Sequence, residues 1–588
     1  MRRHERTRAA RPGRTAWLPK SVLCWREYSR QTLLADAVAG VTVGLVALPL
    51  AMAFAIASGL PPQSGIYCAI VTGFTISALG GSRCQVGGPT GAFVVVVATI
   101  VAHYGVDGLF MCTMMAGVIL ISFGVAGMGG AVRFIPRPVI VGFTNGIGVL
   151  IASTQVKDFF GLAVESVPSD FVGRMRVFAN GASSWTPLTT LLGVAAVGLI
   201  AQARRRRWRV PGPLLALGLG TVAANVLLPS TATIGSRFGG IPTGLPPLHL
   251  PAFRVDLIPT LLPSAVAVAM LGAIESLLSA VVSDRMTGDR HNSNVELIAQ
   301  GVANVLSPVF GGLPATGAIA RTATNVRAGA RTPVAGMIHA VTLFAVLLVA
   351  APAAKFIPLA VLAAILFVVA YDMGEWHEIP RILQLSKTDI SVWLVTFGLT
   401  VFADLTLAVE VGMMLAALLF IRRVADTTTV ERVSNAAIEA GRRHSLQDKQ
   451  IPPWAAIVRI QGPFLFGSAD KLNPTLDAID ELPAIVMLRL RNMTALDGTG
   501  LRAIEDLAER LRATGRHLIV CGARHQPARL LSRPHARRVI GDGNLVPDVA
   551  TALARARYLH AERAGSATKD ARTDAVPLPA EAARRQPG

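Results

Sequence analysis

Apolar segments separated by short polar loops fill the chain from about residue 33 to residue 421. Many of them are nearly free of charged residues, and their lengths approach the about 20 apolar residues needed to cross the hydrocarbon core of a bilayer. They lack the alternation of polar and apolar residues at a period of two that marks the strands of a membrane barrel. Helices are therefore the expected spanning elements, because a helix satisfies its own backbone hydrogen bonds in lipid.

The apolar segments fall into two series of seven, on either side of a polar, proline-rich stretch from Pro229 to Asp256. This pattern predicts an all-α polytopic membrane domain with fourteen transmembrane segments. Three segments, 89–103, 294–308 and 314–327, are short and carry glycine or proline, so hydropathy alone does not establish them. The first series lies at about 33–58, 64–80, 89–103, 109–128, 138–156, 187–202 and 212–228, and the second at about 257–283, 294–308, 314–327, 333–351, 358–371, 388–403 and 405–421.

The two halves, residues 33–228 and 257–421, share short motifs at matching places. Gly88–Ala92 resembles Pro314–Ala318. Arg133–Pro136 resembles Lys355–Pro358 at nearly the same separation along the chain. An odd number of spans in each half makes the repeats opposite in orientation, so the pattern predicts a 7+7 inverted repeat, a common transporter plan. Chance similarity between glycine- and alanine-rich segments is the alternative interpretation.

The net charge of +20 is distributed as in a membrane protein rather than as in a nucleic-acid-binding protein. With the N-terminus inside, the short inner loops carry fourteen basic residues and the outer loops six, which fits the positive-inside rule. The cluster Arg204–Arg209 is the strongest anchor and favours contact with anionic lipid. We therefore expect a multi-pass protein of the inner membrane with both termini cytoplasmic, and no nucleic-acid partner.

Outside the apolar region the chain changes to soluble patterns. Residues 1–32 are expected to form a basic cytoplasmic tail that precedes a transport domain at 33–425, and residues 426–451 to form a linker. From 452 to 560, short apolar runs and a later helical periodicity predict a small cytoplasmic α/β domain. Residues 561–588, rich in Ala, Arg and Pro, are expected to be disordered. The five cysteines form neither a CxxC pair nor a metal-ligand cluster, so no metal site is expected.

Two glycine- and proline-rich segments interrupt the helical pattern at matching places: the first break, Gly87–Gly91, and the second break, Gly311–Gly317. Each is expected to be an extended segment that leads into a helix starting in mid-membrane. A helix N-terminus offers free N–H groups and about half a positive charge. Two such ends aimed at one point make an anion site, with Thr90 and Thr316 at the breaks. A packing kink is the alternative, because glycine and proline are common in membrane helices.

Two charged residues lie inside these apolar segments, where inserting a charge costs at least about 2.5 kcal/mol. Arg321 falls one turn into the second half-helix and is expected to add positive charge to the anion site; snorkelling toward the cytoplasm is the alternative. Glu275 is an isolated carboxylate in the segment 257–283. Burial disfavours its charged form, which suits a proton-coupling group. With Ser276 or Ser279 it would instead bind sodium, and a structural salt bridge to Arg321 is a third interpretation.

In the soluble domain, Asp497–Gly500 links an expected strand to an expected helix. The simpler interpretation is a turn with a helix cap. A regulatory phosphorylation site at Thr499 is the alternative.

Eight motifs along the chain together carry a family resemblance: Ala35–Gly40, Leu48–Ala53, Gly80–Arg83, Gly88–Thr90, Glu275–Leu278, Ser283–Gly288, Phe310–Gly312 and Ala320–Thr322. With them, residues 33 to about 560 resemble the sulfate permease family, the bacterial relatives of solute carrier family 26. The C-terminal part resembles a STAS domain, with Asp497–Gly500 at its strand-to-helix loop. One departure is Leu50, where some members carry Gln.

The resemblance implies a core domain and a gate domain, elevator-type movement and a homodimer. It also implies that the substrate lies between the first and third helices of the first half and the eighth and tenth helices, which belong to the second half. Carried over by position, the substrate site comprises Phe54, Thr90, Gly91, Ala92, Thr316, Gly317, Ala318 and Arg321, and the coupling-ion site comprises Glu275 and Ser279.

These observations predict a secondary active transporter, coupled to protons, that moves a small anion such as a C4-dicarboxylate, sulfate or bicarbonate. The pattern at Leu48–Ala53 is similar to bacterial members that move C4-dicarboxylates with protons. A sodium-coupled bicarbonate transporter and a passive anion channel or exchanger are the alternatives. An enzyme is not expected, because no nucleophile–base pair or phosphate-binding loop lies at mid-membrane depth. No cofactor besides the coupling ion is expected, and a cytoplasmic protein is an expected partner of the STAS domain.

Overall fold

The computed structural model describes residues 17–25, 28–130, 136–164, 167–206, 208, 210–244, 248, 254–403, 405–433 and 451–563. The chain divides into two compact units, Met1–Ala416 and Ala417–Gly588. Most of the predicted N-terminal tail, most of the linker and all but the start of the C-terminal tail lie outside the described residues.

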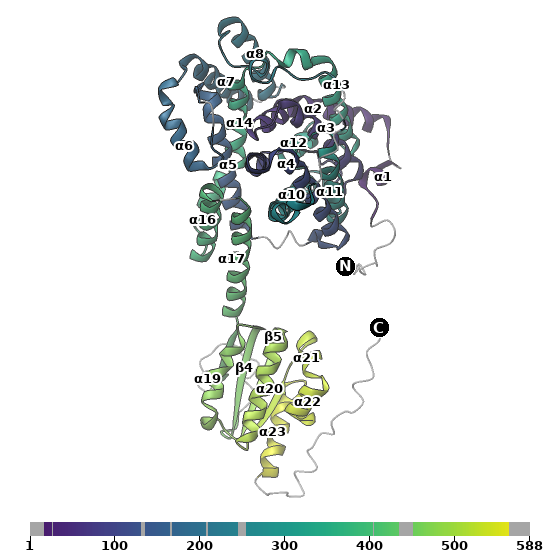
Figure 1. The fold of residues 1–588 in the computed structure, drawn as a ribbon. Helices are drawn as coiled ribbons and strands as arrows, with labels where there is room; N and C mark the ends of the chain where they lie inside the picture. The colour runs from purple at the N-terminus through teal and green to yellow at the C-terminus, as the bar shows by residue number, and fades with distance from the viewer. Residues whose placement is uncertain are drawn as a thin grey trace. The chain divides into compact units, whose positions relative to one another are not determined.

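Each of the fourteen predicted segments coincides with a helix or with part of one (Figure 1). The helices of the first half are α2 (Arg30–Ala57), α3 (Pro62–Leu79), α4 (Val94–Val125), α5 (Arg137–Phe160), α7 (Pro187–Arg205) and α8 (Gly212–Leu227). Those of the second half are α10 (Ile258–Thr287), α11 (Ser293–Val309), α12 (Ile319–Arg327), α13 (Val334–Ala354), α14 (Leu359–Met373), α16 (Lys387–Phe402) and α17 (Leu405–Asp426). Within the described residues, seven helical runs are long and apolar enough to cross a membrane by length and composition.

One predicted boundary is wrong near the N-terminus, and the break predicted between the third and fourth segments lies inside α4. The first span begins at Arg30 rather than residue 33, because the Ser29 hydroxyl caps the helix by accepting from the Thr32 amide at 3.2 Å. A short helix, α1 (Lys20–Cys24), lies within the predicted tail. The segments predicted at 89–103 and 109–128 join into α4, which breaks at Gly105, where φ is 69° and ψ −173°. Glycine reaches these angles at little steric cost, so the run is two helices that meet at a sharp break.

The two breaks pair with each other as a two-stranded antiparallel sheet. Strand β1 (Gly87–Gly88) lies beside β2 (Thr316–Gly317), with Gly87 opposite Gly317 and Gly88 opposite Thr316. A short 3-10 turn, Gly91–Phe93, leads from the first break into α4, and α12 follows the second break directly. Antiparallel pairing is what two equivalent extended segments adopt when their repeats run in opposite directions, so the pairing agrees with the inverted repeat.

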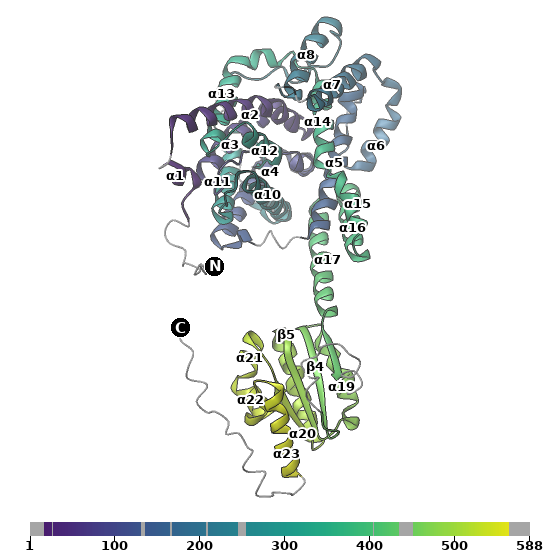
Figure 2. The same cartoon turned by 180° about the vertical axis from the view of Figure 1, so that it is seen from behind.

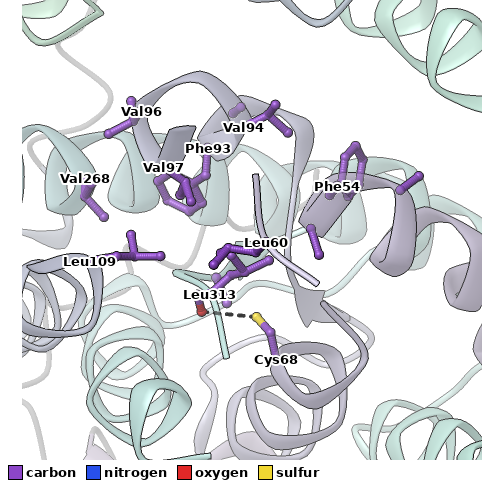
Figure 3. Packing of buried hydrophobic residues seen from close by; sticks show 14 of the residues in the cluster. Phe54, Leu60, Cys68, Phe93, Val94, Val96, Val97, Leu109, Val268 and Leu313 are labelled. Atoms are coloured by element: carbon purple, nitrogen blue, oxygen red, sulfur yellow. Dashed lines mark hydrogen bonds between the residues drawn. The ribbon is translucent and has the colours of Figure 1, made fainter. Parts of the chain in front are cut away.

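Buried apolar side chains from both halves pack around the breaks (Figure 3). Phe93, Val97 and Leu109 come from the turn into α4 and from α4 itself, and Val268 comes from α10. The Cys68 thiol of α3 donates to the carbonyl of Leu313 at 3.2 Å and so fixes one end of the second break to the first half (Figure 3). The interior around the breaks is therefore tightly packed except where polar groups meet.

The C-terminal unit contains a five-stranded sheet in the order β3-β4-β5-β6-β7. Its four parallel strands are β4 (Ala455–Phe464), β5 (Ile485–Leu496), β6 (His517–Cys521) and β7 (Leu545–Val546). Side chains of β5 alternate between two apolar clusters, one with α20 (Gly498–Ala513) and α22 (Pro534–Ile540) and the other with α23 (Val549–Arg563). Helices thus cover both faces of the sheet (Figure 2), which explains why β5 reads as a continuous apolar run in the sequence. The predicted fold class, helical membrane part plus small α/β domain, is confirmed.

The predicted linker contains an element that the sequence analysis missed. Strand β3 (Thr429–Val433) pairs antiparallel with β4 from Thr429 opposite Gln461 to Val433 opposite Ile457. It is an edge strand of mostly exposed residues, so it lacks the apolar signature by which the other strands were found. The sheet therefore begins at Thr429 rather than at residue 452, and residues 434–450 lie outside the described part of the chain.

This edge strand generates a prediction about the isolated domain. A fragment of residues 427–563 should be more stable than one of residues 452–563, because the shorter fragment leaves the edge of β4 without its backbone partners. We expect a loss of at least about 1 kcal/mol, or roughly 3–8 °C in Tm. Thermal unfolding followed by circular dichroism measures it. Equal Tm values for the two fragments would mean that β3 adds nothing to the domain's stability.

Candidate functional site

The two half-helices begin side by side, and neither start is capped by its own side chain. Thr90 precedes the turn into α4 and Ala318 precedes α12, and neither makes a side-chain capping hydrogen bond. The Ala318 amide donates to the carbonyl of Val86 at 2.9 Å, which holds the two chains together just beyond the strand pair. The first N–H groups of two helices therefore converge on one region, as expected for an anion site.

Helix α10 anchors the second break through hydroxyl groups. The Ser276 hydroxyl lies 2.6 Å from the Thr316 hydroxyl and accepts from the Gly317 amide at 3.2 Å. Thr316 also donates to the carbonyl of Gly272 at 3.1 Å. All of these groups are buried, so Thr316, predicted as a substrate ligand, uses its hydroxyl to join the break to α10. Its contribution to a bound anion would come from the backbone it positions.

Glu275 connects α10 to the first break. The Thr90 hydroxyl donates to Oε2 of Glu275 at 3.0 Å. Both residues were predicted from the sequence, Thr90 for the substrate and Glu275 for the coupling ion, and the structure brings them into direct contact. A carboxylate therefore lies at the start of a half-helix, next to the place where an anion would be held.

Arg321 reaches across from the second half to the first break. Its guanidinium donates to the carbonyls of Gly87, at 3.4 Å, and of Pro89. The residue is 4% exposed, so the snorkelling interpretation is wrong. Within the described residues Arg321 and Glu275 form no ion pair, so the salt-bridge interpretation is wrong as well. The positive charge lies against the first break, close to the start of the first half-helix, where it adds to the field of the helix terminus.

The other predicted residues line the region around Gly91. Phe54 of α2 is 5% exposed, and Ala92 and Ala318 are buried on either side. A Cβ atom on Gly91 would meet Met373 Sδ at 2.7 Å, Ile151 Cδ1 at 2.8 Å and Phe54 Cε1 at 3.2 Å.

Ile151 of α5 and Met373 of α14 were not predicted from the sequence. They are ordinary apolar residues in apolar helices, so no signal distinguished them. Through these two side chains, α5 and α14 pack against the first break at Gly91.

The Ser279 hydroxyl forms no hydrogen bond with Glu275 among the described residues. It donates to the Thr322 hydroxyl at 2.9 Å, and Thr322 in turn accepts from the Val86 amide at 3.1 Å. Ser279 therefore joins α10 to α12, one turn of helix beyond Glu275. Among the described residues no group of three or more His, Cys, Asp or Glu side chains is arranged to hold a metal ion.

In the C-terminal unit, Asp497 caps α20. Its carboxylate accepts from the Gly500 amide at 2.8 Å and from the Phe466 amide at 2.8 Å. The simpler interpretation of this loop, a helix cap, is confirmed. Thr499 is exposed beside the cap, and its proposed regulatory role stays a prediction.

Two family models match the chain. Residues 33–396 match the sulfate permease family, and residues 447–552 match the STAS domain. The two matched ranges fall on the helical part and on the α/β part described above.

The chain is also similar to individual proteins. It is 39% identical to the "Putative sulfate transporter YvdB" of Bacillus subtilis, over 88% of this chain and 96% of that protein. It is 35% identical to the "Bicarbonate transporter BicA" of Synechocystis, over 89% and 94% of the two chains. The solved transmembrane domain of a cyanobacterial BicA matches with a TM-score of 0.58 and 36% identity, over 66% of this chain and 98% of that one. The solved structure of SLC26A9 matches with a TM-score of 0.81 over 94% of this chain and 95% of that one, and at 18% identity this likeness concerns the fold alone.

Gly88 offers a test of the position of Arg321. A Cβ atom on Gly88 would lie 2.2 Å from Arg321 Nη1, and the φ angle of Gly88 is 149°. Gly88→Ala should therefore displace the guanidinium from the break and reduce anion uptake at least about tenfold, the effect of losing one charge-assisted contact. Uptake by reconstituted protein measures the change.

Gly198→Ala in α7 is the matched control, because a Cβ atom there meets nothing within 4 Å. Gly198→Ala should transport like the unmodified protein. Normal uptake by folded Gly88→Ala protein would show that the guanidinium position does not matter for transport.

Proposed function

The chain belongs to the sulfate permease family, and on that premise we propose that it is a secondary active transporter that carries a small anion across the inner membrane. It is a multi-pass membrane protein of an anion transporter family rather than an enzyme. The observation that carries the proposal is that two uncapped half-helices start beside a paired strand that the buried guanidinium of Arg321 contacts. Such a place attracts an anion and offers it backbone N–H donors.

The substrate proposed is a small oxyanion or carboxylate. The names of the two relatives above specify sulfate and bicarbonate, and the pattern at Leu48–Ala53 favours a C4-dicarboxylate. All three carry oxygen atoms that accept hydrogen bonds from helix N-termini. The apolar side chains of Phe54, Ile151 and Met373 around Gly91 limit the size of the anion, since they leave little room beside the first break.

We propose a proton rather than sodium as the coupling ion. Sodium requires several oxygen ligands around one point, but the hydroxyls of Ser276 and Ser279 serve Thr316 and Thr322 instead of Glu275. Glu275 meets the Thr90 hydroxyl, at the place where an anion would arrive. A second negative charge there disfavours the charged carboxylate, so Glu275 takes up a proton as the anion binds. The anion and the proton then cross the membrane together, which is cotransport.

Elevator-type movement fits the apolar contact at Gly91. Ile151 and Met373 approach Gly91 and Phe54 without a hydrogen bond to them among the described residues. A surface without directional bonds permits sliding of α4 and α10 against α5 and α14. We propose in addition a homodimer, cytoplasmic termini, and a cytoplasmic protein partner for the STAS domain, as in the sequence analysis.

Uptake by proteoliposomes tests the function. Radiolabelled succinate, fumarate, sulfate and bicarbonate should be compared, each with and without an inward proton gradient. At least one anion should accumulate against its own gradient. Arg321→Ala should lower the affinity for that anion by about 10- to 150-fold, because one charge-assisted contact of about 1.5–3 kcal/mol is lost. Passive equilibration of every anion would identify a channel instead.

Glu275→Gln tests the coupling. The amide mimics the neutral carboxyl group and still accepts a hydrogen bond from Thr90. The variant should therefore exchange anion across the membrane at a rate near that of the unmodified protein, yet lose accumulation driven by a proton gradient. If the variant concentrates the anion as well as the unmodified protein does, the proton is carried elsewhere. Ser279→Ala is the matched control, and proton-driven accumulation should survive it.

A further inference from the structure

A cationic cavity, the Arg83/Arg331 pocket, lies in the first unit, and no residue of the two breaks lines it. It has a volume of about 480 Å³, within the range of small-molecule sites. Several helix ends form its wall: Cys24 of α1, Thr32 at the start of α2, Thr287 at the end of α10, Val326 at the end of α12, and the turn from Gly329 to Thr332 before α13. Each of these ends lies on the face that we propose to be cytoplasmic.

Two arginines give this pocket its charge. Arg83 and Arg331 line it, and none of its lining residues in the described part of the chain is a carboxylate. The Nε atom of Arg83 is buried and has no hydrogen-bond partner in the described part of the chain. A buried donor without a partner costs about 1–3 kcal/mol, so a ligand that accepts from it would be favoured. The side chain of Arg331 is exposed and forms no ion pair within the described residues.

Two carboxylates close to the pocket bind other groups and form no ion pair with Arg83 or Arg331 among the described residues. Asp36 is fully buried and accepts from the amides of Arg331, at 2.7 Å, and Thr332, at 3.1 Å, and from the Thr332 hydroxyl. Asp289 is ion-paired with Lys20 at 2.7 Å. The backbone that carries Arg331 is thereby fixed. Asp289 also attracts the Arg83 guanidinium, but neither Arg83 nor Arg331 forms an ion pair among the described residues.

We propose that the Arg83/Arg331 pocket binds a phosphate group attached to an organic moiety. Guanidinium groups present paired N–H donors that match phosphate oxygens, and two of them balance the charge of one phosphate. The side chains of Met286 and Val326 supply apolar surface for the remainder of the ligand. Two sources share this chemistry: the headgroup of an anionic phospholipid and a soluble nucleotide.

A ligand in the pocket would contact two helices that carry charged residues of the proposed transport site. The ligand would touch Thr287, twelve residues from Glu275 on α10 and so about 18 Å along the helix. It would also touch Val326, on the same helix as Arg321. A molecule held there would bind together the far ends of the two helices that carry the charged residues of the transport site.

Binding to the purified full-length protein tests the proposal and separates the sources. Native mass spectrometry compares phosphatidylglycerol with phosphatidylcholine, and calorimetry in phosphate-free buffer measures AMP. Either phosphatidylglycerol or AMP should bind, and Arg331→Gln should weaken that binding at least about tenfold, with Arg83→Gln adding to the loss. Because the Arg331 side chain is exposed and its backbone makes the contact with Asp36, Arg331→Gln should fold normally.

Two further variants make the outcome decisive. Arg327→Gln removes an exposed arginine on α12 that does not line the pocket, and binding should be unchanged. Arg321→Ala removes the charge of the transport site, and binding should again be unchanged. Loss of binding in Arg321→Ala would assign the probe to the transport site, and binding of neither probe, or equal binding by folded Arg331→Gln protein, would overturn the pocket. None of these outcomes bears on the uptake experiments.

Discussion

Every backbone N–H and C=O group that lies inside an apolar interior needs a hydrogen-bond partner, and the two breaks are where helices stop providing one. The strand pair satisfies part of this need. Side chains satisfy the rest: Asn304 accepts from the Ala315 amide and donates to the Ala315 carbonyl, both at 2.8 Å. Arg321 does the same for the carbonyls of Gly87 and Pro89. The guanidinium that we propose to attract an anion is thus also part of the framework that holds the breaks in place.

Much of the fold and of the proposed site was accessible from the sequence, because glycine, proline and charge are rare enough in apolar segments to be informative. The spacing of Gly87–Gly91 and Gly311–Gly317 located both breaks, and Arg321 and Glu275 stood out as charges in lipid-length helices. The partners of these groups were not accessible. The strands β1 and β2 have two residues each, which is too short for a periodic pattern in the sequence. The sequence also does not show whether the guanidinium of Arg321 binds carbonyl groups or a carboxylate.

Other misses have equally physical causes. Strand β3 is mostly exposed at a sheet edge, so no apolar alternation marks it. Ile151 and Met373 approach Gly91 from distant parts of the chain, and a contact between apolar residues of different helices depends on packing that sequence patterns do not encode.

The pairing of β1 with β2 has a consequence for how the protein is made. The first strand is synthesised with the N-terminal half, but its partner belongs to the C-terminal half. Until the ribosome has delivered Thr316 and Gly317, the carbonyls and amides of Gly87 and Gly88 have no strand to pair with. The N-terminal half therefore enters the membrane as an unfinished body, and the transport centre is completed only by an event late in biogenesis.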